Sequence, residues 1–232
     1  MLWLALSCVL GYEQDGKLTT ISVEQTRSAH YFYYDKAIQS SLRIEALNEE
    51  GESIGHASGN YFKIGMHKFI ISAAHVTDDV HSNVFYDYKN EIKLNLVYID
   101  ETMDIAIFVP EKKIKSVKAV DYRTAKELDL TGVSVVYAGY PADLEKAVFN
   151  GTVATCAAVS FMMQSFALPG ASGSVVFNNK GQAVGVLSAI KIGYHGYSPY
   201  PQIHPGLVYV NRLRMYDRFK VEELIVSWKK LK

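Results

Sequence analysis

Three short stretches of the sequence hold residue types that together could carry out acyl transfer. His75 ends an apolar run and lies in Ala-Ala-His-Val, and Asp104 begins the apolar run Ile105–Val109. Ser172 lies in the glycine-flanked turn Pro-Gly-Ala-Ser-Gly-Ser. The order is His, Asp, Ser, with separations of 29 and 68 residues. Each motif alone is a weak indication of a site, but the three in this order beside β-type segments predict a catalytic triad.

The chemistry assigns each of these residues a role. A serine hydroxyl needs a base within hydrogen-bonding reach, and a neutral His75 imidazole can take the proton of Ser172 and return it to the leaving group. Asp104 can orient the imidazole and stabilise the imidazolium. Gly170 lets the backbone turn so that its N–H and the N–H of Ser172 form an oxyanion hole. We expect Gly173 to leave room where the substrate backbone and His75 approach each other.

The segments that must position these residues are short β-type runs. Alternating or compact apolar runs separated by turn residues begin at Ser41, and a more charged stretch at 111–129 divides them into two series. The pattern predicts an all-β fold of two six-stranded antiparallel β-barrels with a C-terminal α-helix. We expect an N-terminal arm over 1–40, a first barrel over 41–120 with His75 and Asp104, and a second barrel over 121–232 with Ser172. Apolar residues at three- and four-residue spacing predict a closing helix at 217–231.

Composition narrows the classes of function. The 232 residues are 49% hydrophobic, which suffices for a sizeable core. Lys plus Arg and Asp plus Glu both number 24, so the overall charge does not favour a nucleic-acid partner. The apolar residues 2–10 are too few to span a bilayer, and the compartment is left open. Two cysteines exclude a disulfide scaffold, and no ligand set for a metal or cofactor stands out.

Several further motifs accompany the three predicted catalytic residues and resemble those of a known family. From about Ser41 to Met215 the chain resembles the trypsin-like (chymotrypsin-fold) serine proteases, most closely the HtrA-type and viral branch without disulfides. The resemblance implies a serine endopeptidase that acts through an acyl-enzyme on a protein or peptide substrate. We do not expect a PDZ-like domain after the closing helix. The matching segments are Gly59–Ile64, Phe69–Val76, Asp104–Val109, Ala138–Pro141, Phe149–Val153, Pro169–Gly173 and Gly185–Ser188.

The resemblance also implies where substrate binds. Phe166 matches the position at the base of the pocket for the residue before the scissile bond, and Ser188 matches the strand against which the substrate backbone lies. Ile190 stands where trypsin relatives often keep a glycine that leaves this pocket open. A phenylalanine supplies no carboxylate for a substrate cation, so we expect small or apolar side chains at this position. Ala171 replaces the aspartate of zymogen-type relatives, so activation by N-terminal cleavage is not expected.

Two alternatives stay open. The chain could be a trypsin-fold assembly module, for example a phage or viral virion component, with weak or no proteolysis. The aromatic stretch Tyr31–Tyr34 of the N-terminal arm would then serve contacts with a protein partner. An esterase or another acyl transferase could use the same three residues, and no motif separates ester from amide substrates.

Overall fold

A computed structural model describes the backbone of residues 13–14, 17–18, 33–142, 144–193 and 202–231, and the side chains of 33–142, 144–188 and 206–231. The chain consists of two compact units, residues 1–32 and residues 33–232. In the first unit, β1 (Glu13–Gln14) and β2 (Lys17–Leu18) pair as antiparallel strands. The second unit, from Tyr33 onward, holds everything that concerns the predicted site.

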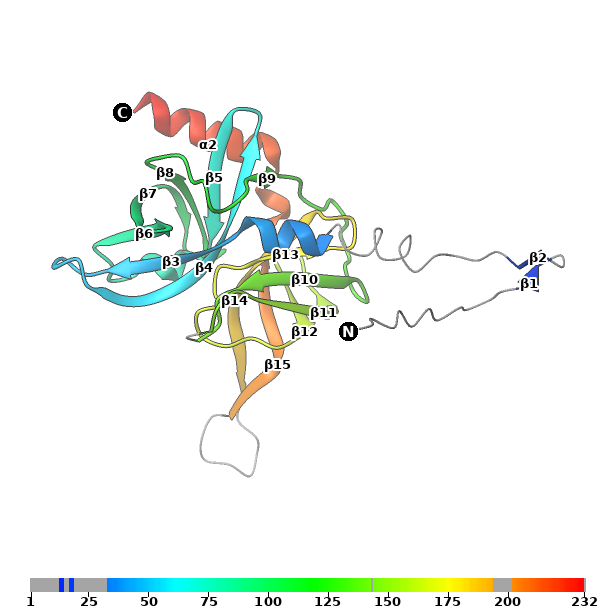
Figure 1. The fold of residues 1–232 in the computed structure, drawn as a ribbon. Helices are drawn as coiled ribbons and strands as arrows, with labels where there is room; N and C mark the ends of the chain where they lie inside the picture. Colours follow the sequence, from blue (N-terminus) through cyan, green and yellow to red (C-terminus); the bar gives the residue numbers. More distant parts are fainter. Residues whose placement is uncertain (1–12, 15–16, 19–32, 143, 194–201, 232) are drawn as a thin grey trace, which may run out of the picture. The chain divides into compact units, whose positions relative to one another are not determined.

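The first barrel is formed by six antiparallel strands in the order β3-β6-β7-β8-β5-β4, closed by pairing of β3 with β4 (Figure 1). The short strand β9 (Val120–Asp121) adds to β4 in parallel. The 3-10 helix η1 (Ala74–Thr77) follows β5. The six strands are β3 (Ser41–Leu47), β4 (Ser53–Ile64), β5 (His67–Ser72), β6 (Ser82–Asp87), β7 (Asn90–Asp100) and β8 (Ile105–Pro110).

The second barrel also closes from six antiparallel strands, in the order β10-β11-β12-β15-β14-β13. The predicted all-β double barrel with a closing helix is therefore confirmed. The short 3-10 helix η2 (Leu213–Met215) leads from the last strand toward the C-terminal helix. The strands are β10 (Ser134–Gly139), β11 (Ala147–Cys156), β12 (Ser160–Gln164), β13 (Val175–Asn178), β14 (Ala183–Gly193) and β15 (Gln202–Arg212).

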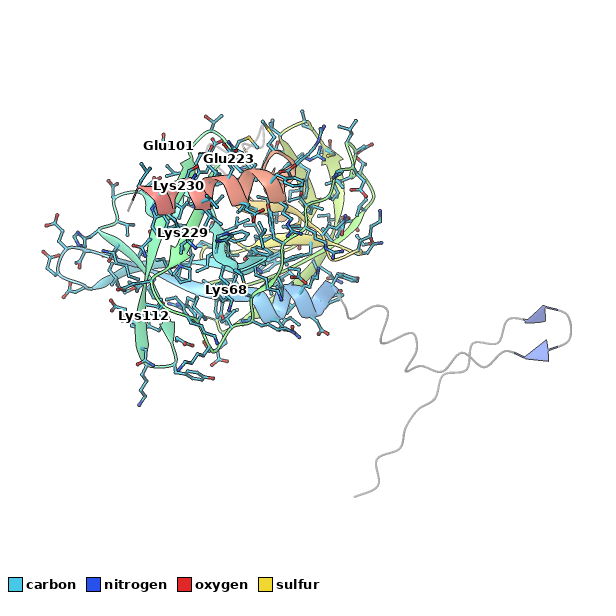
Figure 2. All side chains as sticks on the ribbon, turned by 90° about the horizontal axis from the view of Figure 1, so that it is seen from above. Lys68, Glu101, Lys112, Glu223, Lys229 and Lys230 are labelled. Carbon is cyan, nitrogen blue, oxygen red and sulfur yellow. The ribbon has the colours of Figure 1, made fainter. Side chains whose placement is uncertain are left out.

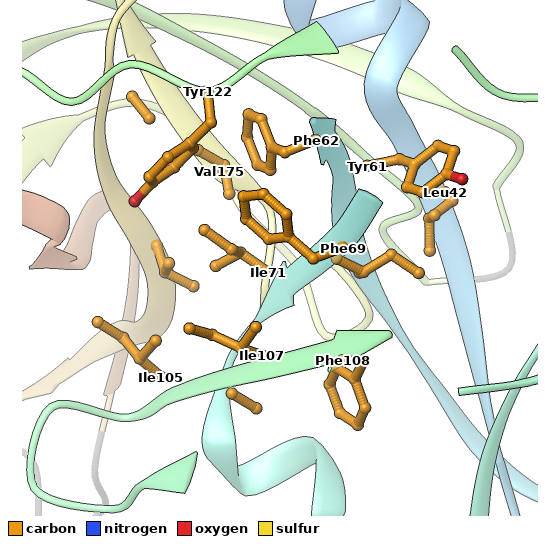
Figure 3. Close-up of a cluster of buried hydrophobic side chains, with 14 of the residues drawn as sticks. Leu42, Tyr61, Phe62, Phe69, Ile71, Ile105, Ile107, Phe108, Tyr122 and Val175 are labelled. Atoms are coloured by element: carbon orange, nitrogen blue, oxygen red, sulfur yellow. The ribbon is translucent and has the colours of Figure 1, made fainter. Parts of the chain in front are cut away.

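An aromatic cluster joins the two barrels into one packed body (Figure 3). Phe62 of β4 lies 6.0 Å from Phe177 of β13 and 5.0 Å from Tyr122, measured between ring centroids. Tyr122 belongs to the connection between the barrels, and its hydroxyl donates to the carbonyl of Tyr216 at 2.6 Å. Because these rings are buried, the connection is part of the core and fixes one barrel against the other.

Two helical segments pack on this body. Residues 33–40, the last of the expected N-terminal arm, are helical, and Ala37 is fully buried. The closing helix α2 (Arg218–Lys230) begins where the Asp217 side chain accepts from the N–H of Lys220 at 3.0 Å. It buries Val221 and Ile225 and carries Glu223, Lys229 and Lys230 (Figure 2).

Candidate active site

The histidine is positioned by the end of a buried strand. Strand β5 ends at Ser72, and the chain turns into η1, where Ala74 and Val76 are buried. This arrangement leaves the His75 side chain 42% exposed on the surface between its two buried neighbours. Because the flanking residues are anchored in the core, the imidazole is held at a fixed place on the rim of the first barrel.

The aspartate reaches the histidine from the turn between β7 and β8. Asp104 has a φ of +47°, a left-handed conformation that aspartate tolerates better than most residues. Its carboxylate accepts from Nδ1 of His75 at 2.9 and 3.0 Å and from the His75 backbone N–H at 2.9 Å. The hydroxyl of Ser188 in β14 donates to the same carboxylate from the second barrel. Both barrels therefore contribute to the orientation of this carboxylate.

These contacts set the protonation of the pair. The hydrogen bond with Asp104 raises the pKa of His75 above its ordinary value of 6.5, and this outweighs burial, which lowers it. Burial raises the pKa of Asp104, but the hydrogen bonds from His75 and Ser188 outweigh it and hold that pKa below 3.8. Asp104 is thus ionised at neutral pH, and Nδ1 of His75 carries the proton, which leaves Nε2 free to act as a base.

The serine lies in a turn whose backbone N–H groups are aimed in a defined direction. Gly170 has a φ of +91°, which only glycine adopts without strain. The carbonyls of Pro169 and Ala171 accept from backbone N–H groups at 2.6 and 3.1 Å. Because N–H and C=O point in opposite directions across a trans peptide, the N–H groups of Gly170 and Ser172 point away from these contacts. Within the described part of the chain, neither N–H has a protein acceptor.

Ser58 of β4 fastens this turn to the first barrel and was not found from the sequence. Its backbone N–H donates to the carbonyl of Ser172 at 2.8 Å, and its hydroxyl donates to the carbonyl of Gly170 at 2.7 Å. The hydroxyl also accepts from the N–H of Tyr140 at 2.9 Å. Ser58 is fully buried, so these bonds are shielded from water.

A side chain is excluded at position 173 for a different reason from the one we expected. A Cβ at this position would lie 2.1 Å from the carbonyl oxygen of Ser58 and 2.1 Å from Oγ of Ser72. The missing side chain therefore makes room for the first barrel, and not for substrate. Its φ of +87° is a second reason for glycine.

His75 and Ser172 face one open cavity of about 360 Å³. The Ser172 hydroxyl donates to the carbonyl of Ser188 at 3.5 Å, and no hydrogen bond joins it to His75 among the described residues. Catalytic hydrogen bonds are often formed only when substrate is present. The lining residues are Ile44, Ala46, Ile54, Gly55, His56, Ala57, His75, Val76, Asp78, Val80, Asn83, Pro169, Gly170 and Ser172.

Of the three expected substrate-binding residues, Phe166 and Ser188 are not among the described residues that line that cavity. Phe166 is 46% exposed and packs 5.9 Å from Phe149, between ring centroids. Ser188 contacts Asp104, as described above. Ile190 of β14 pairs with Val208 of β15, and the side chain of Ile190 lies outside the described part of the structure. Their role in binding the acyl half of a substrate stays a prediction.

The described residues offer neither a membrane-spanning helix nor a cluster of metal ligands. No helix there is long and apolar enough to cross a bilayer. No group of three or more His, Cys, Asp or Glu side chains there is arranged to hold a metal ion.

Comparison with known proteins places this geometry in context. A family model described as the trypsin-like peptidase domain matches residues 57–186. The crystal structure of a serine endoprotease from Yersinia pestis matches with a TM-score of 0.64 at 16% sequence identity. The match covers 83% of this chain and 65% of that chain, so the present chain spans less than two thirds of the length of that protein. A sequence search of curated proteins gave no match.

Proposed function

This chain belongs to the trypsin-like peptidase family, and we propose that it is an endopeptidase that uses Ser172, His75 and Asp104 as its catalytic triad. The observation that carries the proposal is the pair of short contacts, 2.9 and 3.0 Å, between Nδ1 of His75 and the carboxylate of Asp104. They lie beside a cavity that Ser172 also lines. An oriented imidazole next to a serine in a glycine turn is the arrangement that acyl transfer requires.

In the proposed mechanism the Ser172 hydroxyl attacks the scissile carbonyl carbon while Nε2 of His75 takes its proton. The carbonyl oxygen becomes an oxyanion, which the N–H groups of Gly170 and Ser172 stabilise by hydrogen bonds. The C–N bond then breaks, and the imidazolium gives its proton to the leaving amine. A water molecule hydrolyses the acyl-enzyme through the same steps and frees Ser172.

Asp104 serves this cycle as an electrostatic partner. Its carboxylate keeps Nδ1 protonated and stabilises the imidazolium that forms in each half of the reaction. The low pKa of Asp104 supports this role, because a protonated carboxyl would lose both functions.

Hydrolysis of peptide substrates by the purified chain tests the proposal. Ser172→Ala should lower kcat by about 10⁴-fold or more if the triad acts as a unit. The exposed serine on β10, Ser134, gives a matched control, and Ser134→Ala should retain full activity. A folded wild-type protein that hydrolyses neither peptides nor esters would contradict the proposal and favour the assembly module.

We also propose that the residue before the scissile bond is small or apolar. This preference rests on Phe166, since no acidic group stands at that position to pair with a substrate cation. Rates of cleavage after Ala, Val, Leu and Arg in otherwise identical peptides measure it. Faster cleavage after Arg than after the apolar residues would contradict the preference without affecting the triad.

A further inference from the structure

The cavity beside His75 and Ser172 is built mainly from the first barrel. Its walls are mostly apolar, and its volume of about 360 Å³ lies in the range of small binding pockets. Of the described residues of the second barrel, Pro169, Gly170 and Ser172 contribute to its lining. The apolar lining comprises Ile44, Ala46, Ile54, Ala57, Val76 and Val80.

The direction of the reaction decides which half of a substrate this cavity receives. His75 must give its proton to the leaving amine, so the residues that follow the scissile bond have to lie on the imidazole side. Val76, Asp78 and Val80 come within five residues after His75 in the chain, and all of them line the cavity together with His75. We expect the acyl half on the other side of Ser172, where the Ser172 hydroxyl reaches the carbonyl of Ser188. The cavity is therefore placed for the leaving half of the peptide.

The cavity carries one carboxylate and adjoins an acidic hollow. Among the described residues, Asp78 is the one Asp, Glu, Lys or Arg that lines the cavity, and Val80 is shared with a second hollow of about 620 Å³. Glu49, Glu50 and Asp79 line that hollow, and no described Lys or Arg lines either space. A third hollow of about 330 Å³ shares Val80 and Asn83 with the cavity, and Lys93 lines it, whereas Glu49 and Glu50 are not among its described lining residues. Carboxylates of one sign along a cleft attract cations and repel anions.

We propose that this protein selects its substrates by their leaving half: an apolar side chain within the first two positions after the scissile bond, followed by a basic side chain. The apolar side chain fills the space between Ile54 and Val80, and the basic one faces Asp78, Glu49 and Glu50. An extended peptide advances about 3.3 Å per residue, so adjacent hollows can receive neighbouring residues. This inference rests on the proposed function of Ser172 and His75.

Digestion of a mixed peptide library, followed by sequencing of the new N-termini, tests the inference. Wild type should give product N-termini enriched in Val, Leu, Ile, Met or Phe at the first or second residue, with Lys or Arg within the next few. Ile54→Glu should weaken the apolar preference about tenfold, since the polar group would enter the apolar wall. Ile54 is 55% exposed, so this change leaves the core intact.

Charge reversal at the acidic hollow gives a second experiment that tests the inference. Glu49→Lys with Glu50→Lys should lower kcat/KM about tenfold for peptides with a basic leaving half, and less so at high salt. The matched control is Glu111→Lys with Glu223→Lys, two exposed carboxylates that line neither hollow. The control pair should leave the preference unchanged.

Labelling by a fluorophosphonate separates the two ways of failing, because the probe reports Ser172 without a peptide leaving half. Wild type that is labelled and cleaves with no preference after the scissile bond overturns this inference alone. Equal effects of the Glu49/Glu50 pair and of the control pair overturn its electrostatic part. Wild type that is neither labelled nor active overturns the proposed function and this inference with it.

Discussion

Deleting the hydroxyl of Ser58 should damage catalysis from a position that touches neither substrate nor the triad side chains. That hydroxyl donates to the Gly170 carbonyl at 2.7 Å and accepts from the Tyr140 N–H at 2.9 Å. Both partners are backbone groups, and Ser58 is fully buried. Ser58→Ala leaves the two groups without a partner, at a cost of about 1–3 kcal/mol each. We expect the free energy of unfolding to fall by about 2–6 kcal/mol.

The catalytic effect follows from the place of Gly170 in the turn. Without the bond to its carbonyl, the N–H of Gly170 is less firmly held where the oxyanion forms. Loss of one oxyanion donor costs about 10²–10³-fold in kcat, and displacement should cost about 10–100-fold. KM should stay within about twofold, because the ground-state carbonyl makes weaker use of these donors.

Steady-state kinetics with one peptide substrate and thermal unfolding measure both effects. A peptide aldehyde inhibitor adds a specific readout, because its adduct needs the oxyanion donors, and its inhibition constant should rise along with the fall in kcat. The matched control is Ser41→Ala, which deletes a fully buried serine hydroxyl that has no hydrogen-bond partner among the described residues. A folded Ser58→Ala protein with kcat and inhibition constant within twofold of wild type would refute the reasoning.

Three further changes test other parts of the site. Asp104→Asn removes the group that raises the pKa of His75, so kcat should fall about 10⁴-fold. In wild type the acidic limb of the pH–rate profile should have its midpoint above pH 6.5, since only neutral imidazole is a base, and in Asp104→Asn this midpoint should move to lower pH. Ser188→Ala removes one donor from the Asp104 carboxylate and should lower kcat about tenfold with KM unchanged, as initial rates would show. Gly173→Ala places a Cβ 2.1 Å from Oγ of Ser72 at a φ of +87°, so unfolding should become easier by about 2 kcal/mol or more, visible as a lower Tm.

The sequence was sufficient for the parts of this fold that depend on local pattern. Alternating and compact apolar runs predicted the strands, and the spacing of Val221 and Ile225 predicted the closing helix. The contact between His75 and Asp104 could be expected because each stands at the end of a buried strand, and their strands β5 and β8 pair. Helix formation at 33–40 was not predicted, since its polar and aromatic residues show no clear apolar period.

What could not be predicted depends on contacts between distant backbone atoms. Ser58 is 112 residues from Gly170 and 82 from Tyr140 in sequence, and its partners there are main-chain groups that carry no residue-specific signal. The same holds for Gly173, whose neighbour in space is the Ser58 carbonyl of the other barrel. A glycine shows that space is needed, but the sequence alone does not say for what.

The central claim is that Ser172 is a nucleophile activated by His75. Reaction of the purified protein with a fluorophosphonate, followed by mass spectrometry of the digested adduct, tests it most directly. We predict one phosphonyl group per chain, attached to Ser172, and loss of labelling in a folded His75→Ala variant. A probe attached elsewhere, or equal labelling of wild type and His75→Ala, would contradict the claim.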